Sequence, residues 1–414
     1  MAKKMTKEEQ GVANGKADMD FTTDLIKSLN KDIGNRIAYN LTTDIAPTNI
    51  ANWVSTGSRL LDYIISNRKN GGLPEGRIIE IFGPPSIGKS HIALQIAKCT
   101  QKNGGIVVYI DTENATMIEN LHNLGIDIKK KFVFIETSCT EEVFDVAEKT
   151  ILKAKGMNKD VPVTIIWDSV AATSPRAELD GEYDQNTIGL QARSISKGMR
   201  KITGLIGAER VTFIILNQTR TKIGVMYGDP MTTPGGMAIP FHASVRLKLG
   251  SGAHIKRGGD KGDVIGINVS AKTIKNKVSP PFRSCEFEIH FGVGIKEHQQ
   301  LFDMLKTYCN ENDGHAVING NKVCVEGEGT WKTFWVEDNS GKRIIEKKFT
   351  KGNFDKVIDD PAYTSYIEDL IDLAMVKKFN NSEPDIDPES YEEIKAIAGE
   401  VTEMDDETLA ELSS

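Results

Sequence analysis

The chain has 414 residues, of which 39% are apolar and 26% charged, a balance typical of a soluble globular protein and not of a chain that is disordered throughout. Its length leaves room for two or three domains. The sequence contains no uninterrupted run of about 18 apolar residues, so we expect no membrane span. The net charge of −7 is uneven: residues 381–414 hold twelve acids and one base, so the rest of the chain carries about +4.

The cysteines and the first residues predict a cytoplasmic protein. Cys99, Cys139, Cys285, Cys309 and Cys324 are scattered and form no CxxC pair, which suits a reducing compartment and argues against a disulfide framework or a cysteine-ligated zinc. The opening residues are charged like the start of a signal peptide, but no apolar core follows them, so we do not expect secretion.

The acidic tail, 381–414, has two interpretations. It is either a solvated, disordered segment, or a polyanion that competes for a basic surface elsewhere in the chain. The mildly basic body permits a polyanionic partner without requiring one.

Residues 1–20 are polar and we expect them to be disordered. An amphipathic helix is predicted next, because Phe21, Leu25, Leu29, Ile33 and Ile37 recur near a 3.6-residue period. One isolated helix cannot bury such a stripe by itself. It therefore either folds back on its own core or docks on a neighbouring subunit, and the sequence leaves both open.

Short β-branched segments alternate with amphipathic stretches from residue 77 to about 292. Such near-continuous apolar strands alternating with helices predict an α/β fold with a mostly parallel sheet covered on both faces. The predicted strands are 77–82, 106–110, 131–135, 163–167 and 211–216, and the main helices 91–102, 141–155 and 190–206. The segments 264–272 and 285–291 alternate in polarity instead, which indicates half-buried antiparallel additions to that sheet. Residues from about 296 to 379, rich in lysine and aromatic side chains, read as a smaller α+β unit.

A phosphate-binding loop follows the first of these strands. The segment fits the pattern G-x4-G-K-[ST] and opens a helix, so that backbone N–H groups and the helix N-terminus can surround phosphate oxygens. In this pattern the lysine reaches the β- and γ-phosphates and the hydroxyl binds Mg²⁺, which predicts ATP and Mg²⁺ as ligands. The loop residues are Gly83, Pro84, Pro85, Ser86, Ile87, Gly88, Lys89 and Ser90, followed by His91.

Two acids at predicted strand ends complete a candidate catalytic site. Asp168 ends the run 163–167 and could hold Mg²⁺, although many buried strands end in aspartate. Glu113 lies just past the strand 106–110, at the sheet edge where ligands bind in such folds, and is our candidate general base. Taken alone, a glutamate here could equally be a solvated or capping residue.

With these motifs, the chain resembles bacterial and phage RecA-type recombinases, which are ATPases that exchange DNA strands. The resemblance covers about residues 56–295. Besides the phosphate loop, the segments that show it are Ser55-Thr-Gly-Ser, Gly71-Gly-Leu-Pro-Glu-Gly-Arg, Asp168-Ser-Val-Ala-Ala, Gly189-Leu-Gln-Ala-Arg, Leu216-Asn-Gln-Thr-Arg and Lys275-Asn-Lys-Val. It implies a RecA-like P-loop ATPase core, an N-terminal docking helix and a smaller C-terminal α+β domain that gathers DNA. We accordingly divide the chain into an N-terminal segment with a polymerisation helix (1–54), the core (55–295), a C-terminal domain for duplex capture (296–380) and the tail (381–414). The C-terminal unit is longer than in typical bacterial members and looks more like the UvsX-type recombinases of phages.

The resemblance assigns catalytic roles residue by residue. Glu113 matches the glutamate that activates water, and Gln218 matches the glutamine that senses the γ-phosphate beside a DNA-binding loop. Lys275 and Lys277 match lysines that reach the ATP of the neighbouring subunit, in the manner of an arginine finger. Without the family, these two lysines would read as a solvated strand end.

The resemblance also assigns a DNA interface to two loops and a helix. The second loop, 219–236, is glycine-rich and studded with basic and apolar side chains, as single-strand binding requires; by composition alone it could be any disordered surface loop. The first loop is acidic and would not be predicted to bind DNA from its composition. The matched positions are Ile188 on the first loop, Arg193, Ser196 and Arg200 on one face of the following helix, and Arg220, Lys222, Ile223, Gly235 and Gly236 on the second. One departure concerns the base: Asn120 stands where the family usually has an aromatic residue on adenine.

The resemblance thus implies an ATP-dependent homologous recombinase that polymerises on single-stranded DNA and pairs it with homologous duplex. The implied partners are both forms of DNA, further copies of the chain, and single-strand-binding and mediator proteins; no membrane is implied. Two alternatives stay open, a ring-shaped helicase on the same ATPase core and a regulatory ATP-binding module without strand exchange. The family implies a bacterial cytoplasm or that of a phage-infected cell.

Overall fold

The structure is a computed structural model that describes residues 21–34, 36–41, 49–182, 189–221, 231–258 and 261–377. The predictions for residues 1–20, for most of the two DNA-binding loops and for the acidic tail therefore lie outside the described residues. Within the described residues no helix is long and apolar enough to cross a membrane.

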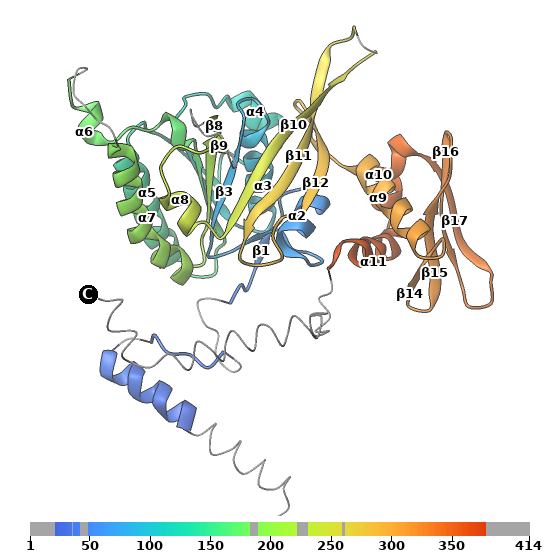
Figure 1. Ribbon diagram of the computed structural model, residues 1–414, viewed down its shortest axis with the longest axis horizontal. Helices are drawn as coiled ribbons and strands as arrows, with labels where there is room; N and C mark the ends of the chain where they lie inside the picture. The colour runs from blue at the N-terminus through green and yellow to red at the C-terminus, as the bar shows by residue number, and fades with distance from the viewer. Residues whose placement is uncertain are drawn as a thin grey trace, which may run out of the picture. The chain divides into compact units, whose positions relative to one another are not determined.

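A nine-stranded sheet forms the larger part of the fold, in the strand order β13-β12-β11-β10-β3-β7-β6-β4-β5 (Figure 1). The six strands from β10 to β5 run parallel. The parallel strands that correspond to predicted strands are β3 (Ile78–Gly83), β4 (Ile106–Asp111), β5 (Phe132–Glu136), β6 (Val163–Asp168) and β7 (Thr212–Gln218). The predicted α/β class with a mostly parallel sheet is confirmed.

The sheet is buried on both faces because alternate residues of its apolar strands point to opposite sides. Ile79 and Ile81 of β3 belong to one hydrophobic cluster, whereas Ile78 belongs to the other. Helices α2 (Arg59–Ser66) and α3 (Lys89–Lys102) supply the first cluster, and α5 (Thr140–Met157), α7 (Leu190–Ala208) and α8 (Ala238–His242) the second. Helix α3 begins two residues earlier than predicted, since Lys89 and Ser90 form its first turn.

One side of the sheet continues as an antiparallel ladder, as the alternation predicted. Strand β11 (Val264–Asn276) pairs with β12 (Ser284–His290), which pairs with β13 (Gly294–Lys296). Strand β10 (Val245–Lys256), which joins this ladder to β3, was not predicted. Its glycines at 250 and 252 interrupt the pattern, and both lie so close to β11 that a Cβ would come within 3 Å of a side chain there.

A four-stranded antiparallel sheet follows, built from β14 (Ala316–Ile318), β15 (Asn321–Glu326), β16 (Trp331–Glu337) and β17 (Arg343–Thr350). Helices α9 (His298–Glu311), α10 (Phe354–Ile358) and α11 (Thr364–Met375) accompany it. The aromatic residues of this unit are mostly its core. The ring of Phe302 meets those of Phe349 and Phe354 edge to face at 5.9 and 5.7 Å. Trp331, by contrast, is 65% exposed.

The remaining elements are short and lie mainly at the ends of the longer strands. They are β1 (Trp53–Val54), β2 (Leu73–Pro74), α4 (Ile118–Asn123), η1 (Val170–Ala172), α6 (Arg176–Leu179), β8 (Arg220–Thr221), β9 (Met231–Thr232) and η2 (Lys351–Asn353).

The predicted N-terminal helix spans residues 21–33. Its apolar stripe is exposed: Phe21 keeps 70% of its surface, Leu25 47% and Leu29 41%. Asn30 closes the helix, because its Oδ1 accepts bonds from the backbone N–H groups of Ile37 and Ala38, both at 2.8 Å. Within the described residues, no other segment of this chain therefore buries the apolar stripe.

Candidate active site

The phosphate loop joins β3 to α3 at the carboxyl edge of the sheet, where the sequence placed it. Two of its glycines are required by geometry. A Cβ on Gly83 would lie 2.7 Å from the backbone oxygen of Leu249, and Gly88 has a φ of +90° with its Cβ position 2.5 Å from the side chain of Ile289. The loop therefore closes tightly between β3 and the start of α3.

A cavity of about 340 Å³ opens above this loop. The loop from Pro85 to Ser90 forms its floor, with His91, and the candidate residues Glu113, Asp168 and Gln218 converge on it. The structure thus brings together acids and an amide from three strand ends, as predicted. Ile267, Ile289 and Phe291, from β11 and the end of β12, complete the wall.

Lys89 is 8% exposed and its ammonium binds the loop itself. Nζ donates to the carbonyl oxygens of Pro84 at 2.7 Å and Gly83 at 3.2 Å. Burial lowers the pKa of Lys89, and the charges of Asp168 and Glu113 oppose that shift. A cation whose hydrogen bonds go to two carbonyl oxygens can exchange them for the stronger charge of a phosphate.

Asp168 is 8% exposed and is held by two hydroxyl groups. The Tyr109 hydroxyl donates to its Oδ2 at 2.5 Å, and the Ser90 hydroxyl bonds it as well. Burial raises the pKa of Asp168, and these two bonds oppose the shift. Ser90 and Asp168, the two predicted metal residues, are therefore in direct contact.

Glu113 stands on a loop that Asp111 holds in place. The two carboxylate oxygens of Asp111, which is 2% exposed, accept four backbone N–H bonds at 2.9 to 3.2 Å from the residues 113–116 that follow. The Ser169 hydroxyl donates to Glu113 from the neighbouring strand end. No role was predicted for Asp111, although an aspartate just before a loop is a common signal for such a turn.

Gln218 joins the candidate base to the second DNA-binding loop. Its Nε2 donates to Glu113 Oε1 at 3.4 Å. The next residue, Thr219, donates its backbone N–H to the carbonyl of Gly83 at 3.2 Å. The loop thus begins in contact with both the phosphate loop and Glu113.

A buried polar network under this loop was not predicted. The side-chain amide of Asn217, fully buried, donates to Glu80 at 3.1 Å and to the carbonyl of Pro234 at 3.0 Å. Glu80 also accepts a bond from Arg246 at 2.5 Å. The two ends of the loop are therefore tied together through β3 and β10. Sequence spacing carries no signal for this network, because its members lie far apart in the chain.

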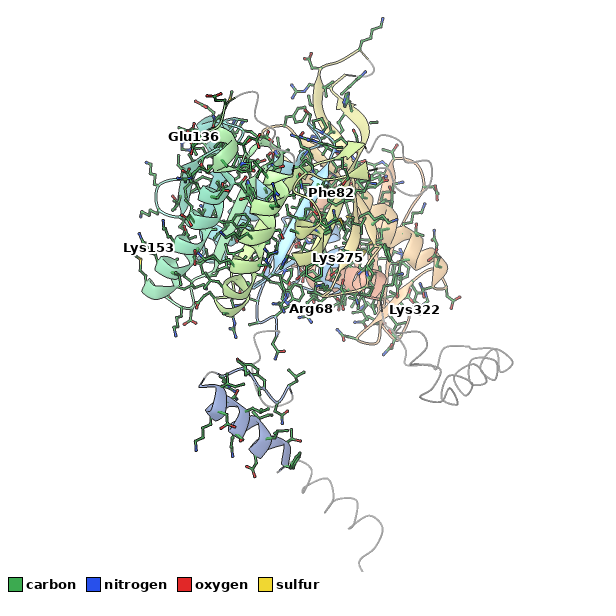
Figure 2. The ribbon with its side chains drawn as sticks, turned by 60° about the vertical axis from the view of Figure 1, so that its left-hand side comes forward. Arg68, Phe82, Glu136, Lys153, Lys275 and Lys322 are labelled. Carbon is green, nitrogen blue, oxygen red and sulfur yellow. The ribbon has the colours of Figure 1, made fainter. Side chains whose placement is uncertain are left out.

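Lys275 and Lys277 are not among the residues that line the cavity of their own chain. Figure 2 labels Lys275 below Phe82, the β3 residue that precedes Gly83. Lys275 pairs in register with Arg246, which pairs with Glu80, and Lys277 bonds the backbone of Ser244 beside the start of β3. The five residue steps from there to Gly83 correspond to about 17 Å along the strand. The Lys275 ammonium instead donates to the carbonyl oxygens of Pro240 at 2.6 Å and Phe241 at 2.8 Å.

The predicted DNA-binding residues are described in part. On α7, Arg193 and Arg200 are exposed, and the Arg200 guanidinium donates to the Ser196 hydroxyl at 2.7 Å, as expected for one helix face. Arg220 is exposed in β8, which pairs with β9. Gly235 and Gly236 have φ of 94° and 72° and pack against α7. Ile188, Lys222 and Ile223 lie outside the described residues.

Two features of the cavity bear on nucleotide recognition. Phe291 keeps 54% of its surface at the cavity wall, and the sequence analysis did not single it out. His91 has a buried Nε2 without a hydrogen-bond partner in the described part of the chain. Burial lowers the pKa of His91, so the ring is held neutral and one nitrogen can donate a bond.

Fold and site together define a P-loop nucleoside triphosphatase in which Glu113 faces the phosphate loop and is bonded to Gln218. Comparison with known proteins is more specific. Residues 21–296 match the family model described as the RecA N-terminal domain. Protein RecA of Sulfurimonas denitrificans is 40% identical over 297 residues, covering 71% of this chain and 82% of the relative, and Protein RecA of Chlorobaculum tepidum is 38% identical over 349 residues, covering 84% and 97%.

The chain belongs to the RecA family. It is an ATP-dependent homologous recombinase with DNA-dependent ATPase activity, as the resemblance predicted. Use of a nucleotide and Mg²⁺, binding of single- and double-stranded DNA, and filament formation follow from that membership.

Proposed function

We propose that the cavity above the phosphate loop binds the triphosphate of ATP, and that Lys275 and Lys277 of a neighbouring copy complete this site. The observation that carries the proposal is that neither lysine lines the cavity of its own chain, because both lie at or just after the end of β11. Along β3, Gly83 lies three residue steps, about 10 Å, beyond the level of Lys275 and five steps, about 17 Å, beyond that of Lys277, and a lysine side chain extends only about 6 Å. A second copy stacked in one direction can bring them into place, which is a heterologous, helix-forming contact.

The residues at the loop fit a nucleotide with its Mg²⁺. Lys89 would exchange its carbonyl partners for phosphate oxygens. Mg²⁺ usually takes one or two carboxylates, a hydroxyl and the phosphates, and Asp168 with Ser90 offers that set. Once bound, Mg²⁺ would neutralise charge on the β- and γ-phosphates. The exposed ring of Phe291 offers a surface for the base, which Asn120 cannot.

Glu113 would accept a proton from the attacking water. It faces the cavity, and Asp111 and Ser169 fix its position. Gln218 bonds Glu113 and would turn to a γ-phosphate oxygen when ATP is bound. Because Thr219 starts the second loop, that exchange would move the loop with the state of the nucleotide.

The DNA-binding residues support a surface next to this switch. Arg193 and Arg200 present cations along α7, and Gly235 and Gly236 pack on the same helix. Together with Ser196, Arg220, Lys222 and Ile223, and with Ile188 of the first loop, they would hold the backbone of one DNA strand.

Filament formation has a candidate surface in the N-terminal stripe and an open sheet edge. Strand β5 is the last strand of the sheet, and its Val133 and Phe134 are each 46% exposed. An unpaired edge with exposed apolar side chains favours pairing with another chain. We propose that the stripe of residues 21–33 docks on a neighbouring copy and does not fold back on its own core.

The division into segments 1–54, 55–295, 296–380 and 381–414 stays part of the proposal. In the third segment, Trp331 and the lysines Lys347 and Lys348 of β17 are exposed, which supports duplex capture by that unit. The acidic tail would compete with DNA for it. Single-strand-binding and mediator proteins are the accessory partners we propose, in the cytoplasm of a bacterium or of a phage-infected cell.

The test measures ATP hydrolysis with and without single-stranded DNA. We expect Lys275→Ala to abolish the DNA-stimulated rate while ATP binding is retained, because the residue serves the neighbour's site. The matched control is Lys272→Ala, an exposed lysine on the same strand, which should retain hydrolysis. Loss of ATP binding in Lys275→Ala would contradict action in trans, and a closed ring in electron micrographs would contradict the filament.

A further inference from the structure

One buried carboxylate joins the two ends of the segment 234–246, which follows the second DNA-binding loop. Glu80 of β3 is fully buried, and its Oε1 accepts a bond from the side-chain amide of Asn217 at 3.1 Å. The same amide donates to the carbonyl of Pro234 at 3.0 Å. The other oxygen of Glu80 accepts a bond from Nε of Arg246 at 2.5 Å. Glu80 therefore holds the first residue of the segment through Asn217 and the last residue directly.

The chain between these two anchors turns tightly and packs on α7. Gly235 and Gly236 have φ of 94° and 72°, and a Cβ on either would lie 3.0 Å from a side chain of α7. Helix α8 begins two residues after this turn, and its Ile239 is fully buried. Because the turn leaves no slack, a displacement of Pro234 would be passed on to α8.

Both lysines of the proposed shared site are attached to this segment. The last carbonyl groups of a helix have no partner within it, and at the end of α8 the Lys275 ammonium binds two of them. It donates to Pro240 at 2.6 Å and to Phe241 at 2.8 Å. The backbone N–H of Lys277 donates to the carbonyl of Ser244 at 2.9 Å. The segment that is held at both ends therefore sets the position from which both lysines extend.

Charge also links Glu80 to Lys275. Arg246 pairs in register with Glu80 on one side and with Lys275 on the other. Burial lowers the pKa of Lys275, and the charges of Lys277 and Arg246 act in the same direction, whereas the charge of Glu80 opposes them. Like charges directly opposite each other on neighbouring strands repel. The Glu80 carboxylate therefore offsets the repulsion between Arg246 and Lys275 across β10 and β11.

We propose that Glu80 and Asn217 are positioning residues for the two lysines that this chain donates to the active site of a neighbouring copy. The inference rests on the proposed function, since it requires these lysines to act in trans. Glu80 and Asn217 are not among the described residues that line the cavity above the phosphate loop. Both are fully buried, so they contact neither a nucleotide nor a neighbour, and they act through the segment 234–246.

Two variants disturb this network from opposite ends of the segment. Asn217→Ala removes the bonds to Glu80 and Pro234, but Asn217 also accepts the backbone N–H of Gln218 at 3.0 Å. Arg246→Gln leaves that bond intact and replaces a side chain that is 16% exposed, so it decides the test if Asn217→Ala does not fold. We expect each variant to bind ATP as the wild type does and to lose about 10- to 100-fold of the DNA-stimulated rate, because a small displacement of a reacting group is that costly.

The test measures ATP hydrolysis by mixed filaments on single-stranded DNA. Mixed in equal amounts with Glu113→Gln protein, which keeps its lysines, either variant should recover about a quarter of the wild-type rate. Mixed with Lys275→Ala protein, neither should recover, because both proteins then lack a correctly placed lysine. A role in folding alone would not sort the variants in this way.

Three outcomes overturn the inference. Recovery with Lys275→Ala protein would place the defect in the variant's own cavity, and wild-type hydrolysis by either variant alone would show that the network positions nothing. The third is that neither mixture recovers although the reference mixture of Glu113→Gln and Lys275→Ala protein does. If the reference mixture itself stays inactive, the shared site of the proposed function is wrong, and the inference falls with it.

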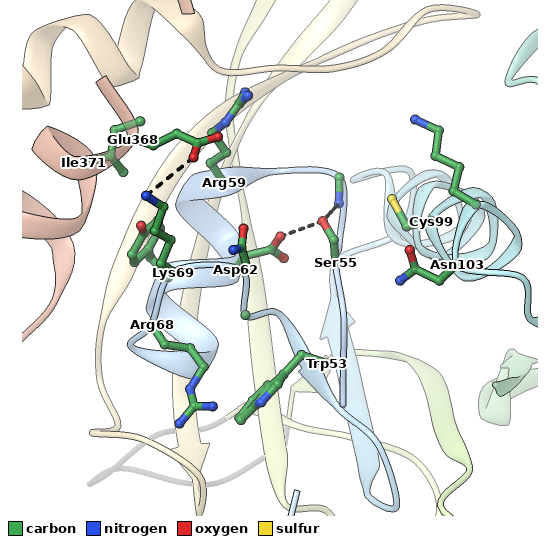
Figure 3. Close-up of a pocket in the computed structure, with 15 residues that line it drawn as sticks. Trp53, Ser55, Arg59, Asp62, Arg68, Lys69, Cys99, Asn103, Glu368 and Ile371 are labelled. Carbon is green, nitrogen blue, oxygen red and sulfur yellow. Dashed lines mark hydrogen bonds and ion pairs between the residues drawn. The ribbon is translucent and has the colours of Figure 1, made fainter. Parts of the chain in front are cut away.

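The matched control is Asp62→Asn, because Asp62 is another buried carboxylate that accepts bonds from its own chain. Figure 3 shows its bond with the Ser55 hydroxyl, 2.6 Å long, beside a cavity of about 490 Å³ that lies away from the phosphate loop, between β1, α2, the end of α3 and α11. Asp62→Asn should keep the normal DNA-stimulated rate. A loss as large as that of Asn217→Ala would show that disturbing any buried polar network slows hydrolysis, which would contradict a positioning role.

Discussion

Two buried carboxylates at the start of α2 predict an unusual dependence of stability on pH. Asp62 is bonded to Ser55 and Thr56, and Glu297 caps the helix by accepting from the Ser58 hydroxyl at 2.5 Å and from the backbone N–H of Arg59 at 2.7 Å. Burial raises the pKa of Asp62 from 3.8 to about 7 and raises that of Glu297 as well. The folded protein therefore holds these protons more tightly than the unfolded chain does.

The sign of the effect follows from proton binding. Below pH 4 both states are protonated at Asp62 and the full contribution to stability is present. As the pH rises towards 7 the unfolded chain loses its proton first, so the free energy of unfolding falls. A difference of about three pKa units is worth roughly 4 kcal/mol in total, and about 3 kcal/mol of it falls between pH 5 and pH 8. The raised pKa of Glu297 also lowers the free energy of unfolding as the pH rises.

The assay is guanidinium unfolding of the nucleotide-free protein at pH 5, 6, 7 and 8, followed by near-ultraviolet circular dichroism. Asp62→Asn removes the titrating group. Between pH 5 and pH 8, the free energy of unfolding of this variant should therefore fall by about 3 kcal/mol less than that of the wild type. The control is Asp127→Asn, an exposed aspartate that accepts backbone bonds in a turn and should follow the wild-type profile. Parallel pH profiles for Asp62→Asn and the wild type would refute the reasoning.

Three further predictions concern the nucleotide site. Glu113→Gln should retain ATP binding in equilibrium dialysis yet hydrolyse ATP about 10²–10⁴-fold more slowly, because the general base is lost but the phosphate contacts are not; weakened binding would argue against a role in the chemical step. Gln218→Ala should keep DNA-independent hydrolysis but lose most of the stimulation by single-stranded DNA, measured as the ratio of the two rates, and an unchanged ratio would show that Gln218 does not couple the sites. Gly88→Ala should weaken ATP binding more than tenfold, since the φ of +90° and the clash with Ile289 distort the loop; Gly156→Ala, where a Cβ meets open space, is its control, and equal affinities in the two variants would contradict this account.

The sequence predicted the elements that local pattern determines. Unbroken apolar runs such as 163–167 produced central parallel strands, and the G-x4-G-K-S string placed the phosphate loop at a strand end. The residues that converge on the cavity could be named because parallel strands all end at one edge. Lys275 and Lys277 were named only through the resemblance, and their place across the sheet became visible only in three dimensions.

What pattern could not predict depends on partners distant in the chain. Asn217 binds Glu80 and Pro234, and none of these carries a local signal for the others. The many aromatic residues of the C-terminal unit could not be divided into core and surface from the sequence, and Phe334 and Phe349 belong to its core. Strand β10 escaped because its glycines, needed where β11 passes close, break the polarity pattern.

The shared active site is tested most directly by mixing two inactive proteins. Glu113→Gln keeps its lysines but lacks the base, and Lys275→Ala keeps its base but lacks one lysine. In filaments assembled on single-stranded DNA from equal amounts of both, about a quarter of the sites would join an intact cavity to an intact lysine across a heterologous contact. The account predicts that the mixture recovers about a quarter of the wild-type hydrolysis rate, whereas a mixture as inactive as either protein alone would contradict it.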